Sequence, residues 1–356
     1  MMRCPSISEL PNPPAGRTGW PWTAEGEQLP ATRADGAAWP KISIVTPSFN
    51  QAAYLEATIR SILLQGYPNL EYIVMDGGST DGSLEIIRKY ERWIAYWKSE
   101  PDGGQYAAIQ KGFERSSGEI MAWLNSDDLY FPWTLHTVIQ ILFAFPNLRW
   151  ISTSSLSILG SKSGLFDISK VDPYNRRDFF SQDFIRRPLV IQQEATFWRR
   201  ELWNQAGAHL ANDLNFAGDF ELWTRFWKYE DLAMTPTPLA MFRFHDQQKT
   251  SDINGYIEEV LAVLNKLHRP FPVPRLIMWT LTSILKRIDP SRNWFGTRTT
   301  IIYLDNQKGR WIKVEYFSFK GAIKALLYSL VDNIRKIMHT DLQHVWSSYN
   351  PNKGKK

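Results

Sequence analysis

The chain has 356 residues and a net charge of +5, with 44% hydrophobic and 22% charged residues, which is ordinary globular composition. This balance excludes an intrinsically disordered protein, because such chains are poor in apolar residues. A single cysteine, Cys4, excludes an internal disulfide framework and a cysteine-rich zinc site.

Residues 1–39 are rich in proline, glycine and alanine and show no helical or strand periodicity. We therefore expect an N-terminal arm rather than a folded unit. Trp20, Trp22 and Trp39 predict that part of this arm packs on the body of the protein, since large aromatic side chains favour burial.

Between residues 41 and 145, apolar strand patterns alternate four times with segments whose apolar residues recur at helical spacing. The predicted strands are 42–46, 70–75, 94–97 and 119–124, and the predicted helices are 51–66, 84–90, 105–115 and 132–145. Such an alternation predicts an α/β fold with a mostly parallel sheet covered by helices on both faces.

A polar loop follows each predicted strand, and these loops begin at Pro47, Asp76, Ser99 and Asn125. In parallel sheets, ligands bind in the crevice beyond the carboxyl ends of the strands. We therefore expect the four loops to converge on one site.

The loop Asn125-Ser126-Asp127-Asp128 places carboxylates where a divalent cation could bridge phosphate oxygens. Helix capping before Pro132 is an equal alternative, and Asp76 could likewise serve only its own turn. Neither a G-x-G-x-x-G motif after the first strand nor a P-loop motif is present. A nucleotide held through a metal, as in sugar nucleotides, remains the favoured ligand.

Residues 149–247 are less regular, although 219–228 has helical spacing. From about 254 the chain is predicted to be helical and basic, and residues 269–356 carry 16 Lys and Arg against 5 Asp and Glu. Gly321–Met338 has an apolar stripe opposite charged residues, which favours an anionic membrane surface, a partner helix or packing on the catalytic domain. No nucleic-acid motif accompanies the charge, so we expect no nucleic-acid partner.

Seven segments in order resemble the family 2 glycosyltransferases: ISIVTPSFNQ, DGGSTDGS, SEPDGGQYAAIQKG, GEIMAWLNSDD, QQEATFWRRELW, GDFELWTR and FRFHDQQKT. The resemblance implies a GT-A fold over residues 40–253, which is a Rossmann-like three-layer α/β/α sandwich, with the basic extension 254–356 beyond it. It also implies inverting chemistry, a nucleotide-sugar donor, and a divalent metal, Mn²⁺ or Mg²⁺.

The same resemblance implies roles for individual residues. Asn125-Ser126-Asp127 matches the D-x-D motif with Asn in the first position, which puts metal coordination on Asp127. Asp128 and His245 are the further candidate metal ligands, although a lone histidine is more often structural. Phe49 would stack on uracil. The implied donor-binding residues are Pro47, Phe49, Asn50, Asp76, Asp102, Gln105, Asn125 and Asp127.

Asp219, in G-D-F-E-L-W, matches the family's catalytic base. An acceptor hydroxyl is a poor nucleophile until a carboxylate takes its proton. Glu221 is the alternative base, and a helix cap is the alternative role for Asp219. Gln193 and Glu194 precede the aromatic residues Phe197, Trp198 and Trp203, which form either an acceptor wall or part of the core.

The leading hypothesis is a hexosyltransferase that uses a UDP-hexose to build cell-envelope polysaccharide or to extend a lipid-linked saccharide. The alternatives are a catalytically inactive GT-A-like scaffold at a membrane and a sugar nucleotidyltransferase. Prolines interrupt the first residues, so they do not resemble a signal peptide, and no apolar run approaches the roughly 18 residues of a membrane span. We expect a cytoplasmic protein, with peripheral contact at the inner face of the plasma membrane if the extension 269–356 binds lipid.

Overall fold

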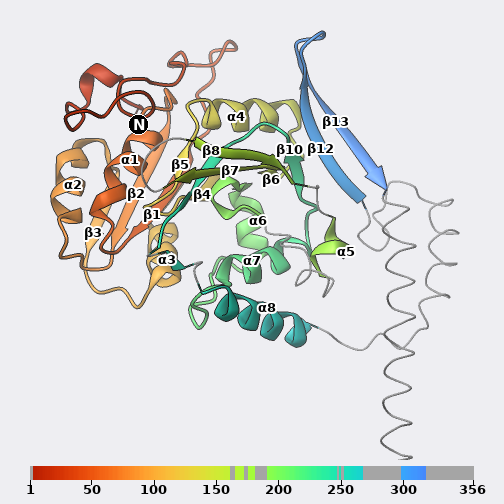
Figure 1. Cartoon of the computed structure of the whole chain (residues 1–356). Coiled ribbons are helices and arrows are strands. Elements are labelled where there is room, and N and C mark those ends of the chain that lie inside the picture. Colours follow the sequence, from red (N-terminus) through yellow and green to blue (C-terminus); the bar gives the residue numbers. More distant parts are fainter. Residues whose placement is uncertain are drawn as a thin grey trace, which may run out of the picture. The chain divides into compact units, whose positions relative to one another are not determined.

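The computed structural model describes residues 3–160, 165–171, 175–180, 191–246, 248–249, 252–267 and 298–317 (Figure 1). The predicted amphipathic helix at 321–338, and all of 269–356 except 298–317, lie outside the described residues. Within the described part, no helix is long and apolar enough to cross a membrane.

The described residues form two sheets. The larger has nine strands in the order β13-β12-β10-β6-β9-β4-β1-β2-β3, and the smaller has four in the order β5-β11-β7-β8. The strands are β1 (Ile42–Ser48), β2 (Leu70–Asp76), β3 (Tyr96–Ser99), β4 (Ile120–Trp123), β5 (Leu129–Tyr130), β6 (Trp150–Thr153), β7 (Ser155–Gly160), β8 (Leu165–Lys170), β9 (Phe197–Arg199), β10 (Ala233–Thr235), β11 (Ala240–Phe244), β12 (Arg298–Asp305) and β13 (Arg310–Phe317).

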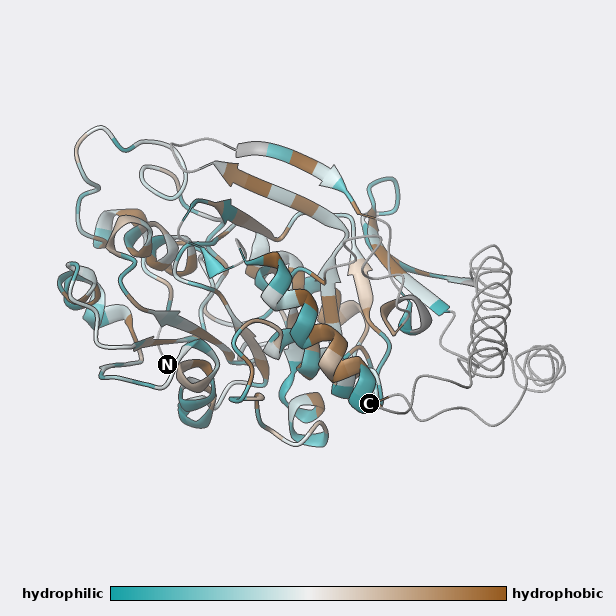
Figure 2. Ribbon diagram, turned by 60° about the horizontal axis from the view of Figure 1, so that its bottom comes forward, coloured by the Kyte–Doolittle hydropathy of each residue, from teal (hydrophilic) through white to brown (hydrophobic). Residues whose placement is uncertain are grey.

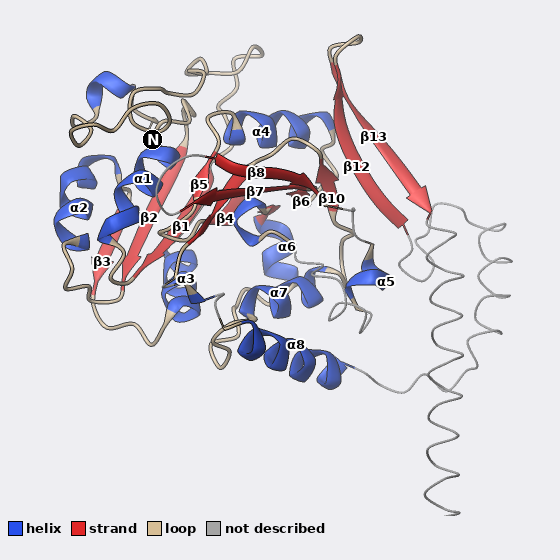
Figure 3. Ribbon diagram, viewed as in Figure 1, coloured by secondary structure: helices blue, strands red, loops and turns tan. Residues whose placement is uncertain are grey.

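Eight described α-helices accompany the strands (Figure 3). They are α1 (Ala52–Leu63), α2 (Ser83–Tyr90), α3 (Gln105–Arg115), α4 (Thr134–Ala144), α5 (Arg176–Phe179), α6 (Arg200–Gln205), α7 (Gly218–Phe226) and α8 (Ile253–Leu267). Three short 3₁₀ turns are η1 (Ile7–Glu9), η2 (Glu91–Trp93) and η4 (Gln193–Ala195). The four strand–helix units predicted between residues 41 and 145 are confirmed.

The larger sheet is mostly parallel. β1 pairs in parallel with β2 and β4, and β2 with β3, whereas β9 is inserted antiparallel between β4 and β6. The polar loops after β1, β2, β3 and β4 therefore leave the same edge of the sheet. This is the arrangement that the alternating sequence pattern predicts.

Successive residues of the central strands belong to two cores on opposite faces of the sheet. In β4, Ile120 and Ala122 pack with residues of α1 and α4, whereas Met121 and Trp123 pack with residues of α3, α6, α7 and α8. Figure 1 shows α4 and the α7–α8 pair on opposite sides of the sheet, and Figure 2 shows apolar and polar residues interleaved along the covering helices. The strands are buried on both faces, as parallel sheets require.

Tryptophans fill much of the core that contains Met121 and Trp123. Trp123 stacks on Trp223 with 5.8 Å between ring centroids, and Trp150 and Trp198 contact Trp223 at 5.5 and 5.7 Å. The predicted aromatic cluster Phe197, Trp198 and Trp203 is at most 3% exposed. These three rings therefore pack in the core, and the interpretation as an acceptor wall is wrong.

The N-terminal arm packs on the body, as its tryptophans predict. Arg60 of α1 is fully buried and its guanidinium donates to three arm carbonyls, those of Pro11, Pro21 and Trp22, at 2.9–3.0 Å. The Trp20 indole also donates to the Tyr130 carbonyl at 2.8 Å. A buried cation paired with carbonyls from two parts of the arm fixes the arm's path.

The segment after residue 253 begins as predicted with α8, but residues 298–317 form strands β12 and β13 rather than helix. The β-branched run from Thr299 to Ile302 favours a strand, and the turn at 306–309 ends in Gly309, whose φ of +58° suits glycine. β12 pairs in parallel with β10, so this segment extends the larger sheet.

Candidate active site at the carboxyl edge of the sheet

The loops after β1 and β2 are joined by hydrogen bonds. Asn50, with φ of +52°, donates its backbone N–H to Ser79 Oγ at 2.8 Å and accepts from the Thr80 N–H through Oδ1 at 2.9 Å. Phe49 is 60% exposed, whereas its neighbour Ser48 is buried at the end of β1. The loop thus presents the Phe49 ring to solvent, where a nucleobase could stack on it.

Asp76 organises these loops. Its buried carboxylate accepts the N–H groups of Gly78 and Ser79 and the hydroxyls of Ser79 and Ser99. All four donors belong to the protein. The observed contacts of Asp76 therefore bind the loop after β2 to the end of β3, and its predicted contact with a donor stays a prediction.

The loop after β3 approaches the other two. A side chain at Gly77 would have its Cβ 3.1 Å from an Asp102 oxygen and 3.2 Å from the Phe49 ring, so Phe49, Gly77 and Asp102 are immediate neighbours. Asp102 also accepts the Gly104 N–H at 2.8 Å, just before α3. Pro47 is buried in β1, so it can support Phe49 but offers little surface itself.

The loop after β4 is joined to α3 and η4. Gln105 donates to Asn125 Oδ1 at 2.8 Å, and Asn125 donates to Gln193 Oε1 at 3.2 Å. Gln193 in turn donates to the Trp123 carbonyl at 2.7 Å. The predicted convergence of the four loops is therefore present, and Gln193 is a member of the network that the donor-site prediction did not include.

Asp127 lies beside a basic and aromatic group. His245 Nε2 is 3.0 Å from Asp127 Oδ2, and the His245 ring lies 4.5 Å from the Tyr54 ring. The Arg243 side chain donates to the Asp127 carbonyl at 2.7 Å and its guanidinium lies 5.0 Å from the Tyr54 ring centre. Strand β11 thus carries Arg243 to the residue predicted to bind metal.

Asp128 is arranged differently from Asp127. Its side chain is 1% exposed, and Oδ1 accepts the backbone N–H of Arg243 at 2.9 Å. Burial raises the pKa of Asp128 well above its usual range, and the neighbouring charges of Asp127 and Glu194 raise it further. These contacts are those of a residue that connects β11 to the loop, rather than of an exposed metal ligand.

Asp219 is the second residue of α7 and is largely buried. Its Oδ1 is fully buried and has no hydrogen-bond partner among the described residues. Burial raises the pKa of Asp219 to about 6, against the lowering effects of the Phe220 N–H and the Tyr106 hydroxyl. A buried oxygen without a partner is uncommon in proteins and calls for an explanation.

Glycine lets Tyr106 approach Asp219. A Cβ at Gly218 would lie 2.8 Å from the Tyr106 ring, so only glycine permits this packing. The Tyr106 hydroxyl donates to the Phe216 carbonyl at 2.7 Å, and Glu259 of α8 accepts three N–H groups from residues 215–217. The start of α7 is therefore held from two sides.

The alternative base, Glu221, is engaged elsewhere. Its carboxylate forms an ion pair with Arg225 one turn later, with N–O distances of 2.8–3.1 Å. Asp219 has no such partner, so the geometry favours Asp219 over Glu221.

Glu194 connects the two groups of carboxylates. It is 6% exposed, and burial together with the charges of Asp219 and Asp127 raises its pKa to about 7. The loop after β4 and the start of α7 both contact the start of α3, since Gln105 donates to Asn125 and the Tyr106 ring packs against Gly218. The sequence draws attention to Glu194 only through its place before the aromatic residues.

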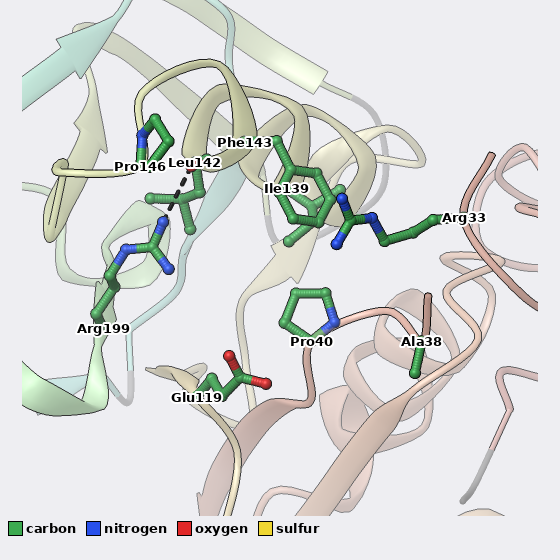
Figure 4. A pocket seen from close by; sticks show the side chains of 9 residues that line it. All are labelled: Arg33, Ala38, Pro40, Glu119, Ile139, Leu142, Phe143, Pro146 and Arg199. Carbon is green, nitrogen blue, oxygen red and sulfur yellow. Dashed lines mark hydrogen bonds between the residues drawn. The ribbon is translucent and has the colours of Figure 1, made fainter. Parts of the chain in front are cut away.

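A cavity of about 420 Å³ opens elsewhere, between the arm, α4 and the β4 region (Figure 4). Arg33, Glu119 and Arg199 are its charged residues, and the remaining lining residues are mostly apolar. Glu119 directly precedes β4, so the cavity lies at the amino ends of the parallel strands. It shares no residue with the candidate site.

Among the described residues, no group of three His, Cys, Asp or Glu side chains is arranged to hold a metal ion. Asp127 and His245 are the predicted ligands that come into contact. Any bound cation would therefore need oxygen ligands from another molecule, as is usual for Mg²⁺ beside phosphates.

Comparison with known proteins gives a consistent result. Residues 43–146 match the description Glycosyl transferase family 2. An uncharacterized glycosyltransferase of Rickettsia typhi is 28% identical over 240 residues, which are 67% of this chain and 75% of that protein. TuaG of Bacillus subtilis, a putative teichuronic acid biosynthesis glycosyltransferase, is 38% identical over 94 residues, which are 25% of this chain and 36% of that protein.

Among solved structures, S. aureus TarS 1–349 in complex with UDP-GlcNAc is similar with a TM-score of 0.52 and 16% sequence identity. The similarity covers 70% of this chain and 73% of that one. At this identity it shows a common fold.

Proposed function

We propose that the chain is a family 2 glycosyltransferase of the GT-A fold, which transfers a hexose from a UDP-hexose to a polysaccharide or lipid-linked saccharide, with inversion and with a divalent metal. The observation that carries this proposal is the partnerless, buried Oδ1 of Asp219 beside a site that also contains Asp127 and Glu194. UDP-GlcNAc in TarS and the teichuronic acid pathway in the name of TuaG support the donor and acceptor classes.

Asp219 is the proposed base. With a pKa of about 6 it is ionised at neutral pH and still basic enough to accept a proton as the acceptor oxygen attacks the anomeric carbon. The bond from that carbon to the diphosphate oxygen breaks at the same time, on the opposite face. A single displacement of this kind turns an α-linked donor into a β-linked product.

On the donor side, Phe49 is the proposed stacking surface for the base, next to Asp102. The Asn125 side chain is held by Gln105 and Gln193, which fixes the loop that carries Asp127. These contacts pre-organise the donor loops before any ligand binds, which lowers the ordering cost of binding.

The residues fit a metal bound together with phosphate. Asp127 is partly exposed and contacts His245, so these two would hold the ion with diphosphate oxygens completing its shell. When bound, Mn²⁺ or Mg²⁺ neutralises the charge that develops on the departing diphosphate. We assign Asp128 a positioning role through Arg243 rather than the predicted role as a ligand.

The test uses the full chain with Mn²⁺ or Mg²⁺ and a panel of UDP-, GDP- and dTDP-hexoses, with product detection by mass spectrometry. We expect release of a nucleoside diphosphate and a product whose anomeric proton coupling in NMR reports inversion. Retained configuration would contradict the single displacement. Absence of release from every donor would favour the scaffold alternative, and UDP-sugar formation from UTP and a sugar 1-phosphate would favour the nucleotidyltransferase.

A further inference from the structure

A buried glutamine lies beside the end of β4. Gln193 belongs to η4, which directly precedes β9, and β9 pairs antiparallel with β4. The first residues of an antiparallel partner lie at the end of the strand that it pairs with, so η4 comes beside the loop that follows β4. Gln193 is 9% exposed and lies outside the segment 43–146 that matches the family.

The side-chain amide of Gln193 is held in one orientation. Its Nε2 donates to the backbone carbonyl of Trp123 at 2.7 Å, and a carbonyl oxygen can only accept. The Gln193 Oε1 is therefore turned towards Asn125, whose Nδ2 lies 3.2 Å away. Because the Trp123 carbonyl decides which end of the Gln193 amide is the acceptor, residue 125 must supply a donor.

Asn125 meets this requirement and continues the same direction of hydrogen bonding. Its Nδ2 donates to Gln193 and lies 3.4 Å from Asp128 Oδ2, and its Oδ1 accepts from Gln105 Nε2 at 2.8 Å. The hydrogen bonds thus run in one direction, from the start of α3 through Asn125 to Gln193 and the Trp123 carbonyl. Both ends of the Asn125 amide have partners within the protein.

An aspartate at position 125 would complete the D-x-D motif but would not suit this environment. An ionised carboxylate accepts hydrogen bonds and cannot donate them, so it could still accept from Gln105. Its other oxygen would face Gln193 Oε1 and Asp128 Oδ2, where the Asn125 Nδ2 lies now. Facing acceptors repel, and a buried amide oxygen without a donor costs free energy. The contact with Gln193 therefore explains why asparagine occupies the first position of the motif.

We propose that Gln193 is a positioning residue for donor binding, which requires asparagine at position 125 and thereby holds the loop that carries Asp127. This inference rests on the proposed function, in which Asp127 binds the metal together with the diphosphate. The Asp127 carbonyl accepts from the Arg243 side chain at 2.7 Å, so the loop is held on both sides of Ser126. Asn125 then acts through its hydrogen bonds rather than as a metal ligand.

The experiment is calorimetric titration of the full chain with UDP and GDP, each with Mn²⁺ and after EDTA treatment. The measured quantity is the gain in diphosphate affinity that Mn²⁺ produces. For Asn125→Asp we expect this gain to fall about five- to tenfold, because the loop that carries Asp127 moves away from the Gln193 acceptor. If Asn125 were instead a weakened metal ligand, the added carboxylate would increase the gain. The sign of the change therefore distinguishes the two roles.

A double-mutant cycle separates direct coupling from a general loss of packing. In a Gln193→Met background, Asn125→Asp should reduce the gain by less than about twofold further, because the opposing acceptor is absent. Gln65→Glu is the matched control, since Gln65 is a buried glutamine that donates to the Phe131 carbonyl at 2.8 Å and accepts the Leu135 N–H at 3.0 Å. We expect this control to lower the thermal midpoint and to leave the gain from Mn²⁺ unchanged.

The outcomes separate the inference from the function on which it rests. If Mn²⁺ strengthens the binding of neither diphosphate to the wild type, the metal-assisted donor site of the proposed function fails, and the inference fails with it. If the wild type shows the gain and Asn125→Asp keeps or increases it, the function stands and the inference is wrong. A loss from Asn125→Asp that is equally large in the Gln193→Met background would also overturn the inference, because Gln193 would not be its cause. Thermal midpoints of all variants check that each protein is folded.

Discussion

Asp76 and Asp219 both lie near the carboxyl edge of the sheet, but the protein surrounds them differently. Asp76 accepts four hydrogen bonds from the loop after β2 and from the end of β3. Asp219 has a buried Oδ1 that accepts none from the described residues. The donor loops thus use their carboxylate to hold themselves together, whereas the start of α7 keeps an oxygen available for another molecule.

This difference teaches how to separate architecture from chemistry among similar acidic residues. A buried carboxylate with all its acceptors filled stabilises its surroundings, and its removal costs folding free energy. A buried carboxylate that has an oxygen without a hydrogen-bond partner has a raised pKa, because burial disfavours its charged form. It therefore destabilises the folded state while it is ionised. Substitutions at the two positions should therefore affect different measurements.

Asp219→Asn should break the comparison most strongly. We expect kcat to fall by about 10²–10⁴-fold, because the base is lost, while the Kd for UDP changes less than twofold. The unfolding free energy above pH 7 should rise by about 1–3 kcal/mol, since in the wild type stability is lost as pH rises from the ordinary carboxyl pKa of 3.8 to the folded-state pKa of about 6, and it stays lost above that pH. Kinetics and urea denaturation measure both effects. Glu221→Gln is the control for kcat. A larger loss of kcat in Glu221→Gln than in Asp219→Asn would mean that Glu221 is the base.

Asp76→Ala should show the reverse pattern. The four donors around the carboxylate would lose a buried partner, so we expect the unfolding free energy to fall by about 2–4 kcal/mol. Donor affinity should fall with it as the loops lose order. Urea denaturation checks the stability, and the exposed Asp213→Ala is the matched control. Full stability in Asp76→Ala would mean that these hydrogen bonds do not hold the loops.

Asp127→Asn tests the metal on the donor side. We expect Mn²⁺ to strengthen UDP binding to the wild type. In the variant, we expect the gain in affinity from Mn²⁺ to be about tenfold smaller, since one oxygen ligand is weakened. Without metal, both proteins should bind UDP equally. Titration with UDP before and after EDTA treatment measures the difference, and Asp246→Asn in the neighbouring segment serves as control. An unchanged Mn²⁺ effect would exclude Asp127 as a ligand.

The smallest expected effect is a shift in the pH dependence of kcat, which tests the ionisation of the Asp219 carboxyl group. Asp219 must be deprotonated to act, so kcat should fall about tenfold per unit below pH 6. The Tyr106 hydroxyl lowers the pKa of Asp219, so Tyr106→Phe should move this limb to higher pH. An unmoved limb would contradict the assignment to Asp219.

Two other carboxyl groups could contribute to the same part of the pH profile. Glu194 has a pKa of about 7, and the charge of Glu259 also raises the pKa of Asp219. Profiles of Glu194→Gln and Glu259→Gln therefore separate their titration from that of Asp219. A limb that disappears in Glu194→Gln would assign the titration to Glu194.

The sequence predicts the four strand–helix units well because each is a local pattern of apolar residues. The close packing of α3 on β1 follows the same logic, since a Cβ at Gly112 would lie 2.5 Å from Val45. Residues 298–317 form a strand pair that the basic composition and apolar spacing of the sequence after residue 253 do not predict. Its strand character depends on pairing with β10, whose paired residues lie 67 positions earlier in the chain.

The residues of the candidate site likewise differ in how far the sequence predicts them. The loops could be grouped because parallel strands end at a common edge, but the sequence does not distinguish Asp127 from Asp128. The difference arises from the N–H of Arg243, 115 residues away, which occupies the second carboxylate. The place of Glu194 in η4, next to the Gln193 that contacts Asn125, likewise depends on the antiparallel insertion of β9. Such relations are set by tertiary pairing and leave no local pattern.

The hydrogen bonds from Arg60 to the N-terminal arm have a practical consequence for the design of a shortened protein. A protein trimmed to begin at residue 40, just before the family match, would lose three of the four acceptors of the buried Arg60 guanidinium and keep only the Tyr90 hydroxyl. Breaking such a buried arrangement typically costs about 3–5 kcal/mol, a large fraction of the stability of most domains. The smallest autonomous version of this enzyme therefore starts well upstream of its recognisable motifs.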